Sequence, residues 1–309
     1  MRISSTSLQS EADRIFDDGM EYWWKGDVAA ACRLFRRALR CDPRHADAHN
    51  HLGVDLMERG RLKEAEKRFQ AAIQGGECAL VSDKELVEWG RIENRPYLRA
   101  LANLALLLRR ERRYEEALEL HEKVLALNPN DNQGIRWLLG EDYHRLGRLE
   151  EAIAAYKKAL EEPGVCHSLA LALFQTREEK KAGVALLRGF AANQYIAPML
   201  LGERWEKVNG WHGTNTAEPE WATDYVKEQG DLWRNVPESA KMLRRWWFAG
   251  PVQEWRSHLD NLMVQLASLE PGSERSLVVR QQFQLESEES IRELARRVES
   301  DPSRGVECD

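Results

Sequence analysis

The stretch GMEYWWKGDVAAACRLFRRALRCDP (19–43) is followed, 34 residues further on, by GVDLMERGRLKEAEKRFQAA (53–72). Both begin with glycine, carry an alanine twelve positions later and have a phenylalanine four positions after that. Two later stretches, aligned on Ala105 and Gly140, repeat most of these landmarks. A period of this length is typical of helical pairs that stack on one another. The sequence therefore predicts an all-α repeat protein.

The order of small and large residues gives this pattern a physical basis. Small residues let the two helices of one pair approach closely, and the large residues fill the space between neighbouring pairs. Pro43 and Pro129 follow second helices, where a missing N–H and a fixed φ end the helix. One pair cannot bury its own apolar face, so the pairs must stack. The pattern resembles the tetratricopeptide repeat (TPR), which implies a right-handed superhelical solenoid with a concave groove.

We expect about five helical pairs and additional elements at the C-terminal end. The fifth pair is degenerate and covers roughly 166–199, with Pro198 at its end. The predicted segments are an N-terminal tail (1–11), repeats one and two (12–79), an insertion (80–97), repeats three to five (98–199), a Trp-rich helical cap (200–269) and a C-terminal tail (270–309). Because the repeats form their own continuous core, we expect them to stay folded without the tail.

The stretch LNPNDNQGIR (127–136) is predicted to be the turn between repeats three and four. Pro129 ends one helix, and Asn130, Asp131 or Asn132 can cap the next by accepting from its free N–H groups. Gly134 leaves room for packing. The turn then directs the Arg and Trp that follow it toward the groove.

The insertion LVSDKELVEWGRIENRPY (80–97) separates repeats two and three. Ser82 followed by Glu85 predicts a short capped helix through Trp89 that ends at Gly90. Two placements remain open: the insertion projects as a binding loop, or it extends the second helix of repeat two against its neighbour.

Seven of the eleven tryptophans fall between residues 205 and 255. We expect helices at 218–234, 237–248 and 253–268. Most of these tryptophans should form a cap over the open end of the solenoid; the alternative is an aromatic interface, where tryptophan is enriched. In the tail, LVVRQQFQL (277–285) alternates as a strand does, and Ser287 should cap a last helix. That strand could pair with a partner's edge or with a second copy in a homo-oligomer, or the segment could be helical.

Composition restricts the classes of partner. The net charge is −6, which disfavours a general nucleic-acid or anionic-membrane role. No run of 18 apolar residues occurs, and residues 1–16 lack the apolar centre of a signal peptide, so we expect a cytoplasmic protein. The cysteines are scattered without a CxxC pair and predict reduced thiols that mostly fill apolar space. They are Cys32, Cys41, Cys78, Cys166 and Cys308.

Residues 89–247 carry a more specific resemblance. The blocks are WGRIENRPYLRALANLALLL, LNPNDNQGIRWLL, NQYIAPMLLGE and EPEWATDYVKEQGDLWRNVPESAKML. They resemble a family of bacterial TPR proteins that is loosely related to the eukaryotic suppression-of-tumorigenicity TPR proteins. The resemblance covers about half of the chain and implies a scaffold without catalytic residues. The Cys-rich zinc motif of some bacterial relatives does not occur in this sequence.

The TPR resemblance also implies where a partner binds. The concave wall of such domains comes from the first helix of each repeat. Asparagine amides there can donate to and accept from a peptide backbone, and arginine pairs with carboxylates. The residues that we expect to contact a protein or peptide in the groove are Asn50, His51, Arg99, Asn103, Arg136 and Trp137. For the last two the alternative is structural: Trp137 packs between repeats, and Arg136 bonds to the preceding turn.

Other groups of residues have simpler interpretations. The chaperone-binding Lys/Asn/Asn/Lys/Arg clamp is not matched, because Phe16 and Met20 occupy its first two positions. The arginine cluster in LLRRERRYEE (107–116) predicts a solvated helix end. The histidines of HADAHNH (45–51) are explained by a turn and a groove-facing helix, and His212 has no evident partner.

The sequence contains no Walker, Rossmann, GxSxG or HExxH motif. We therefore predict no enzyme activity, no cofactor and no metal. The leading hypothesis is a cytoplasmic adaptor or scaffold that binds a protein or peptide through its groove or C-terminal appendage. The alternative is an obligate structural subunit of a bacterial multiprotein complex, such as one used in defence or secretion.

Overall fold

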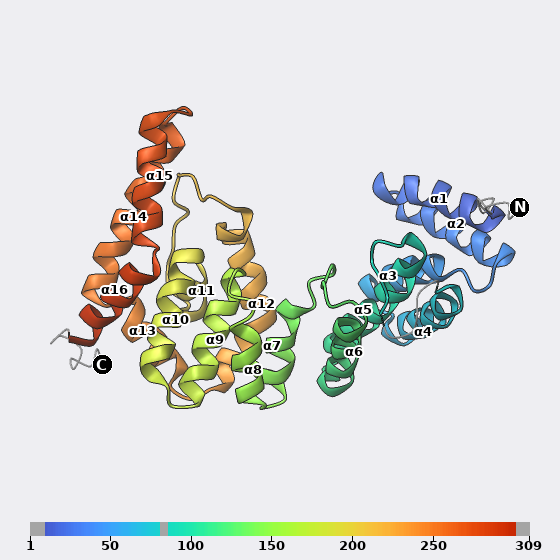
Figure 1. Ribbon diagram of the computed structural model, residues 1–309, viewed down its shortest axis with the longest axis horizontal. Coiled ribbons are helices and arrows are strands. Elements are labelled where there is room, and N and C mark those ends of the chain that lie inside the picture. The colour runs from blue at the N-terminus through green and yellow to red at the C-terminus, as the bar shows by residue number, and fades with distance from the viewer. Residues whose placement is uncertain (1–9, 81–85, 301–309) are drawn as a thin grey trace, which may run out of the picture. The chain divides into compact units, whose positions relative to one another are not determined.

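The computed structural model describes residues 10–80 and 86–300. Within those ranges every regular element is a helix, and sixteen are α-helices (Figure 1). The predicted all-α fold is confirmed. The chain divides into two compact units, Met1–Asp142 and Tyr143–Asp309, and the division falls inside α7 (Arg136–Arg145).

The first unit is a series of antiparallel helix pairs. Its pairs are α1 with α2, α3 with α4, and α5 with α6, and each pair is in extensive contact. The helices are α1 (Glu11–Trp24), α2 (Val28–Cys41), α3 (Ala46–Glu58), α4 (Leu62–Ala79), the short 3-10 helix η1 (Ile92–Asn94), α5 (Arg95–Arg110) and α6 (Tyr114–Leu127).

The landmark residues perform the packing that their spacing predicts. A Cβ atom added to Gly19 would lie 2.7 Å from the Phe35 ring, and one added to Gly53 would lie 2.5 Å from the Phe69 ring. The same glycine–phenylalanine contact therefore closes two successive pairs. The alanine landmark is completely buried in four consecutive pairs, as Ala31, Ala65, Ala117 and Ala152.

The turn inside each helical pair also repeats. One residue there has a positive φ, a conformation that glycine adopts most easily. These residues are Gly26 (81°), Gly60 (73°), Arg112 (62°), Gly147 (74°) and Arg177 (65°). The last of them lies between α9 and α10, which supports a fifth repeat in the predicted region. Pro198 does not end that pair, because it lies within the later helix α11.

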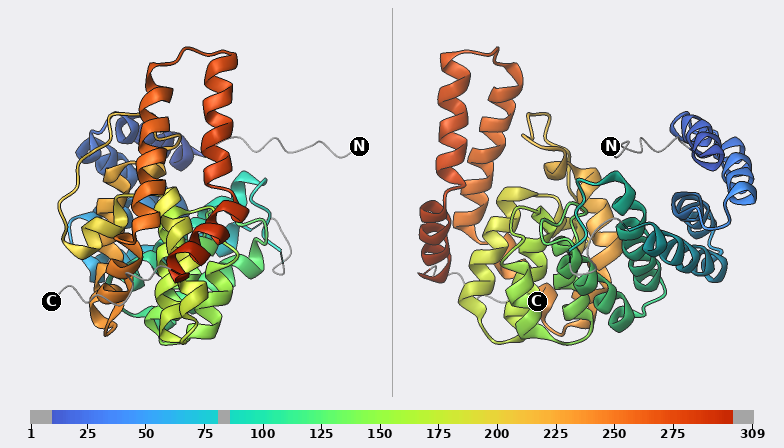
Figure 2. Two further views of the ribbon diagram at one scale, coloured as in Figure 1. Left: turned by 90° about the vertical axis from the view of Figure 1, so that its left-hand side faces the viewer. Right: turned by 45° about the vertical axis from the view of Figure 1, so that its right-hand side comes forward.

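The second unit combines repeat helices with additional ones. Figure 2 shows α14 and α15 as a long antiparallel hairpin. The helices are α8 (Leu149–Tyr156), α9 (Pro163–Gln175), α10 (Glu179–Ala192), α11 (Ile196–Leu201), the 3-10 helix η2 (Asn215–Ala217), α12 (Pro219–Asn235), α13 (Ser239–Trp247), α14 (Gly250–Ser268), α15 (Ser273–Leu285) and α16 (Glu288–Ser300).

The Trp-rich region contributes both core and surface. Trp233, Trp246, Trp247 and Trp255 are buried in the same apolar core as α9 and α10. Trp205 and Trp221 remain about 40% exposed. The four buried tryptophans form core, as the cap interpretation predicts, and an interface role for the exposed ones stays a prediction.

Of the interpretations left open for 277–285 the helix is correct and the strand is wrong, because this segment forms most of α15. A single strand would leave its backbone groups unpaired, whereas a helix satisfies them internally. Ser287 caps the following helix as predicted: the Ser290 N–H donates to its Oγ at 3.3 Å. That helix, α16, packs into the large core through Ile291 and Val298. The structure thus does not support the expectation that 270–309 is dispensable for folding.

The insertion differs from its predicted form. Ser82 and Glu85 lie outside the described residues, but Leu86–Glu88 is not helical and a turn follows at Trp89. The segment is anchored instead by the Val87 N–H, which donates to the Leu127 carbonyl at 2.7 Å. It therefore packs against the end of α6.

Candidate functional site

Two helices of the first unit present neighbouring stripes of accessible side chains. On α5 the stripe consists of Arg99, Asn103, Leu106 and Arg110, spaced so that they share one helix face. The opposite face of α5 is buried. On α3 the corresponding residues are Asp47, His51, Val54 and Glu58. Because α3 and α5 are in contact, these eight residues form one surface, which we call the α3–α5 face.

An ion pair joins the two stripes. Arg99 Nη1 donates to Asp47 Oδ1 at 2.8 Å, and the Arg99 side chain keeps 34% of its surface exposed. The guanidinium also lies 5.9 Å from the Trp89 ring centroid. Arg95 approaches the same ring from the start of α5. The insertion thus places an aromatic residue beside the α3–α5 face.

The centre of the α5 stripe has the features of a recognition surface. The Asn103 side chain is partly exposed and has no hydrogen-bond partner within the described ranges. Leu106, one turn further, is 39% exposed. Arg110 follows and donates to the Met57 carbonyl at 2.9 Å. A free amide beside an exposed leucine can bind a peptide backbone and an apolar side chain together.

His51 and Asn50 have mainly structural contacts. The His51 ring packs against Phe16 and Trp23, and its Nδ1 lies 2.9 Å from the Asp47 carbonyl. Burial lowers the pKa of His51 despite that bond. Asn50 is only 2% exposed, and its amide donates to the Pro96 carbonyl at 3.0 Å. Its Oδ1 has no partner. Asn50 therefore offers little surface to a partner.

Arg136 and Trp137 form a second group at the 127–136 turn. Asp131 is the cap among the three candidates: its carboxylate accepts from the Ile135 N–H at 2.7 Å and from the Arg136 N–H at 3.0 Å. Arg136 also bonds to Asp131 through its side chain, and its guanidinium lies 4.6 Å from the Trp137 ring centroid. The Trp137 ring packs over Gly134, where a Cβ would overlap it, yet Trp137 stays 40% exposed.

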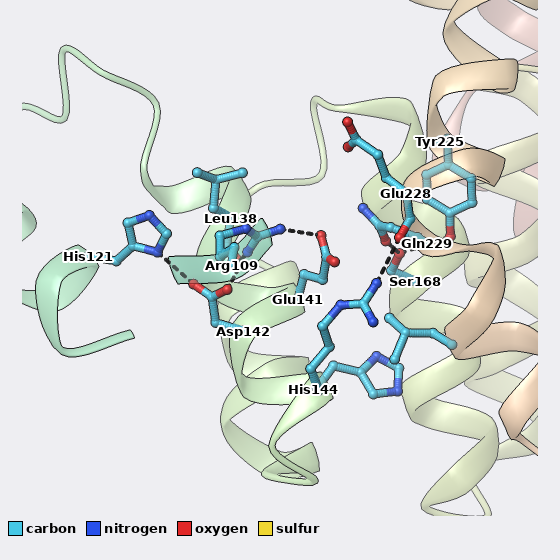
Figure 3. Close-up of polar contacts among 12 residues, drawn as sticks. Arg109, His121, Leu138, Glu141, Asp142, His144, Ser168, Tyr225, Glu228 and Gln229 are labelled. Carbon is cyan, nitrogen blue, oxygen red and sulfur yellow. Dashed lines mark hydrogen bonds and ion pairs between the residues drawn. The ribbon is translucent and has the colours of Figure 1, made fainter. Parts of the chain in front are cut away.

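The predicted solvated arginine cluster is only partly correct. Arg109 is nearly buried and bonds to Glu141 at 2.6 Å and to Asp142, whose other oxygen lies 2.6 Å from His121 Nδ1 (Figure 3). Burial by itself would lower the pKa of Arg109, but the two carboxylates raise it overall. Arg113 does lie at the surface and bonds to carboxylates around it. Arg109 therefore stabilises the packing of α7 on α5 and α6.

The remaining polar groups singled out from the sequence serve local structure. His45 caps α3, with its Nδ1 accepting from the Ala48 N–H at 3.2 Å. His49 lies 3.0 Å from the Pro43 carbonyl. His212 gains a partner in the fold, because its Nε2 lies 2.8 Å from the Tyr195 hydroxyl. Four cysteines in the described ranges are free thiols, and burial raises the pKa of Cys32 to about 11.

Several residues of the α3–α5 face and its edge were not selected from the sequence, among them Asp47, Trp89 and Leu106. Asp47 and Leu106 occupy groove positions in the repeat register, so the spacing alone could have indicated them. Trp89 lies in the insertion, where the repeat pattern gives no register.

Comparison with known proteins matches two parts of this chain to repeat models. Models described as tetratricopeptide repeat match residues 16–77 and 96–161. Among curated proteins, the Cell division cycle protein 16 homologues of Homo sapiens and Mus musculus are each 28% identical over 142 residues, or 46% of this chain. The chain spans 21% of the length of these relatives.

Solved structures with similar architecture include two TPR proteins. YrrB, described as a TPR protein with an unusual peptide-binding site, has a TM-score of 0.46 and 17% identity over 58% of this chain and 85% of its own. PilF of Pseudomonas aeruginosa has a TM-score of 0.44 and 19% identity over 80% of this chain and 96% of its own. Within the described ranges, no helix is both long and apolar enough to cross a bilayer. The repeat matches and the helical pairs over residues 16–161 show that this chain contains tetratricopeptide repeats.

Proposed function

We propose that this protein is a non-enzymatic adaptor that binds a protein or peptide on the α3–α5 face. TPR domains typically mediate protein–protein interactions. The observation that carries the proposal is the α5 stripe, where the unpartnered Asn103 amide lies beside exposed Leu106 and between two arginines. Such a stripe suits a peptide with an acidic group.

Each residue has a distinct role in this proposal. Asn103 bonds to the peptide backbone, and Leu106 contacts an apolar side chain. Arg99 binds the acidic group of the partner and exchanges part of its bond to Asp47 for it. His51 contributes the edge of the same surface, and buried Asn50 holds the start of α5 through Pro96. Arg136 and Trp137 provide a second contact point at the 127–136 turn.

The test is a paired substitution, Arg99→Ala with Asn103→Ala. We expect partner binding to weaken by roughly 1–3 kcal/mol, the range for hydrogen bonds that involve a charge. The melting temperature should change little, because the two side chains are partly exposed. The partner is first captured from native lysate with the wild-type chain, and affinities are then measured by calorimetry.

The matched control is Arg37→Ala with Arg40→Ala, two exposed residues of α2. This variant should bind as the wild type does. Equal affinity of the Arg99/Asn103 variant would exclude the α3–α5 face. A large fall in its melting temperature would instead assign these residues to folding.

One observation favours a second candidate, a permanent structural subunit of a larger complex. The α14–α15 hairpin exposes Val264 by 50%, Leu277 by 56% and Phe283 by 64%. Exposed apolar groups of this kind are common at protein interfaces. A chain that is insoluble when expressed alone and soluble when co-expressed with its captured partner would support this candidate over a reversible adaptor.

A further inference from the structure

Two cavities adjoin in the second unit, and neither belongs to the α3–α5 face. One has a volume of about 270 Å³ and the other of about 290 Å³. Arg256 of α14 and Gln194 line both. We call the pair the Arg256 cavity. Each volume lies near the lower limit of roughly 300 Å³ for small-molecule sites, so the cavity suits a group of about one residue.

Arg256 is a partly buried cation whose side chain has few polar partners. Its guanidinium lies 3.5 Å from the Trp247 ring centroid, and its Nε atom is buried without a hydrogen-bond partner. Within the part of the chain that the structure describes, its side chain makes one hydrogen bond, a long one of 3.4 Å from Nη1 to Gln253 Oε1. Burial lowers the pKa of Arg256 to about 10, although the charge of Asp260 opposes this.

The Arg256 side chain is partly exposed, but its Nε atom is buried. A partly buried guanidinium without a paired anion is unfavourable, because desolvation of the charge is not offset. Asp260 lies one helical turn away but forms no ion pair with Arg256 within the described ranges. A carboxylate is the anion that best matches the planar donor fork of arginine. An occupant with a carboxylate would therefore supply what Arg256 lacks.

Two more orphaned atoms indicate what else the occupant carries. Asp260 Oδ1 and Gln282 Oε1 are buried acceptors without a donor. Asp260 lines the larger cavity and Gln282 the smaller one. Both would be satisfied by N–H groups next to the carboxylate. The smaller cavity also has apolar walls, formed by Leu259, Met263 and Trp211.

We propose that the Arg256 cavity binds an apolar α-amino-acid unit, with its carboxylate on Arg256, its N–H on Asp260 or Gln282, and its side chain against Leu259 and Met263. Both a peptide C-terminus and a free amino acid carry this unit. The acidic group of Asp260 disfavours occupants that have a carboxylate but no donor. This site is independent of the adaptor surface proposed above.

The first experiment uses the full chain and four probes in calorimetry: N-acetyl-L-leucine, its amide, free L-leucine and a tetrapeptide that ends in leucine. We expect the acids to bind and the amide to bind at least about tenfold more weakly, because it lacks the charge that pairs with Arg256. Tight binding of the tetrapeptide with weak binding of free leucine identifies a peptide terminus; the reverse identifies an amino acid. Equal binding of acid and amide, or no saturable binding of any probe, overturns the proposal.

The second experiment assigns the site. Arg256→Gln should abolish binding of the acids. Asp260→Asn should weaken the binding of free leucine more than the binding of N-acetyl-leucine, because only the free amine is charged. Arg99→Ala with Asn103→Ala should bind all probes as the wild type does, which separates this site from the α3–α5 face. Unchanged affinity of a folded Arg256→Gln variant overturns the proposal. If that variant does not fold, Asp260→Asn and the acid–amide pair still decide the outcome.

Discussion

The two units of this protein bury their apolar residues differently. In the first unit the core consists of three separate groups, each confined to neighbouring helices: around Phe35, around Phe69 and around Leu101. In the second, one large group joins α8, α9 and α10 with α13, α14 and α16, and two small groups lie around Tyr195 and Leu266. Stacked repeats contact only their nearest neighbours. The added C-terminal helices therefore convert the later repeats into a unit with a shared core.

Removal of α16 tests this difference most strongly and should cause the largest loss of stability. A chain that ends at Leu285 loses four buried apolar residues from the large core: Ile291, Leu294, Ala295 and Val298. Burial of each of the larger side chains stabilises the fold by roughly 1.5–3 kcal/mol. Their summed contribution of about 5 kcal/mol approaches the free energy of unfolding of a whole domain. Calorimetric melting should show that the second unit loses its cooperative transition. Arg296→Ala, on the exposed face of α16, is the control and should melt as the wild type does. Retention of that transition in the truncated chain would show that the shared core does not depend on α16.

Substitution of Arg109 should cause the next largest loss of stability, and this loss should affect the first unit. Arg109→Met removes the cation while Glu141 and Asp142 stay buried, with side chains 6% and 0% exposed. Breaking one partner of a buried ion pair typically costs about 3–5 kcal/mol. Chemical denaturation followed by circular dichroism measures this loss. Arg148→Met, which removes an exposed arginine paired with Glu151, should cost less than about 1 kcal/mol. Similar losses for the two variants would mean that the Arg109 cluster is accessible to water.

The smallest expected loss of stability comes from disturbing the contact between a repeat helix and the Trp-rich region. A Cβ added to Gly183 of α10 would overlap the Trp246 ring. We expect Gly183→Ala to destabilise by roughly 1–3 kcal/mol through overpacking. Gly230→Ala in α12 is the matched control, because its added Cβ would meet the flexible end of Arg234 at 3.1 Å and Val226 Cγ1 at an ordinary 3.5 Å. That change should be neutral or slightly stabilising, since alanine favours helix. Equal stabilities by thermal melting would show that Trp246 can move away without loss.

Local spacing determined most of the architecture. The 34-residue period, the small residues that meet aromatic rings and the turn residues specify the helical pairs of the first unit, because these contacts join residues close in sequence. A cap among residues 130–132 followed from the same local chemistry, and the structure identifies Asp131 as that cap. The candidate groove positions Arg99 and Asn103 could also be named from the repeat register, although their role in binding stays a proposal.

Other features depend on contacts between distant residues. The pairing of Arg99 with Asp47, the burial of Arg109 and the packing of α16 on α10 each join positions at least 30 residues apart. The segment 277–285 has an alternating pattern suited to a strand, yet it is helical because no described strand is available to pair with it. Arg256 appears in sequence as an ordinary surface arginine. Only the tertiary structure shows it against Trp247 between two cavities, because burial is a property of all the chain around a side chain.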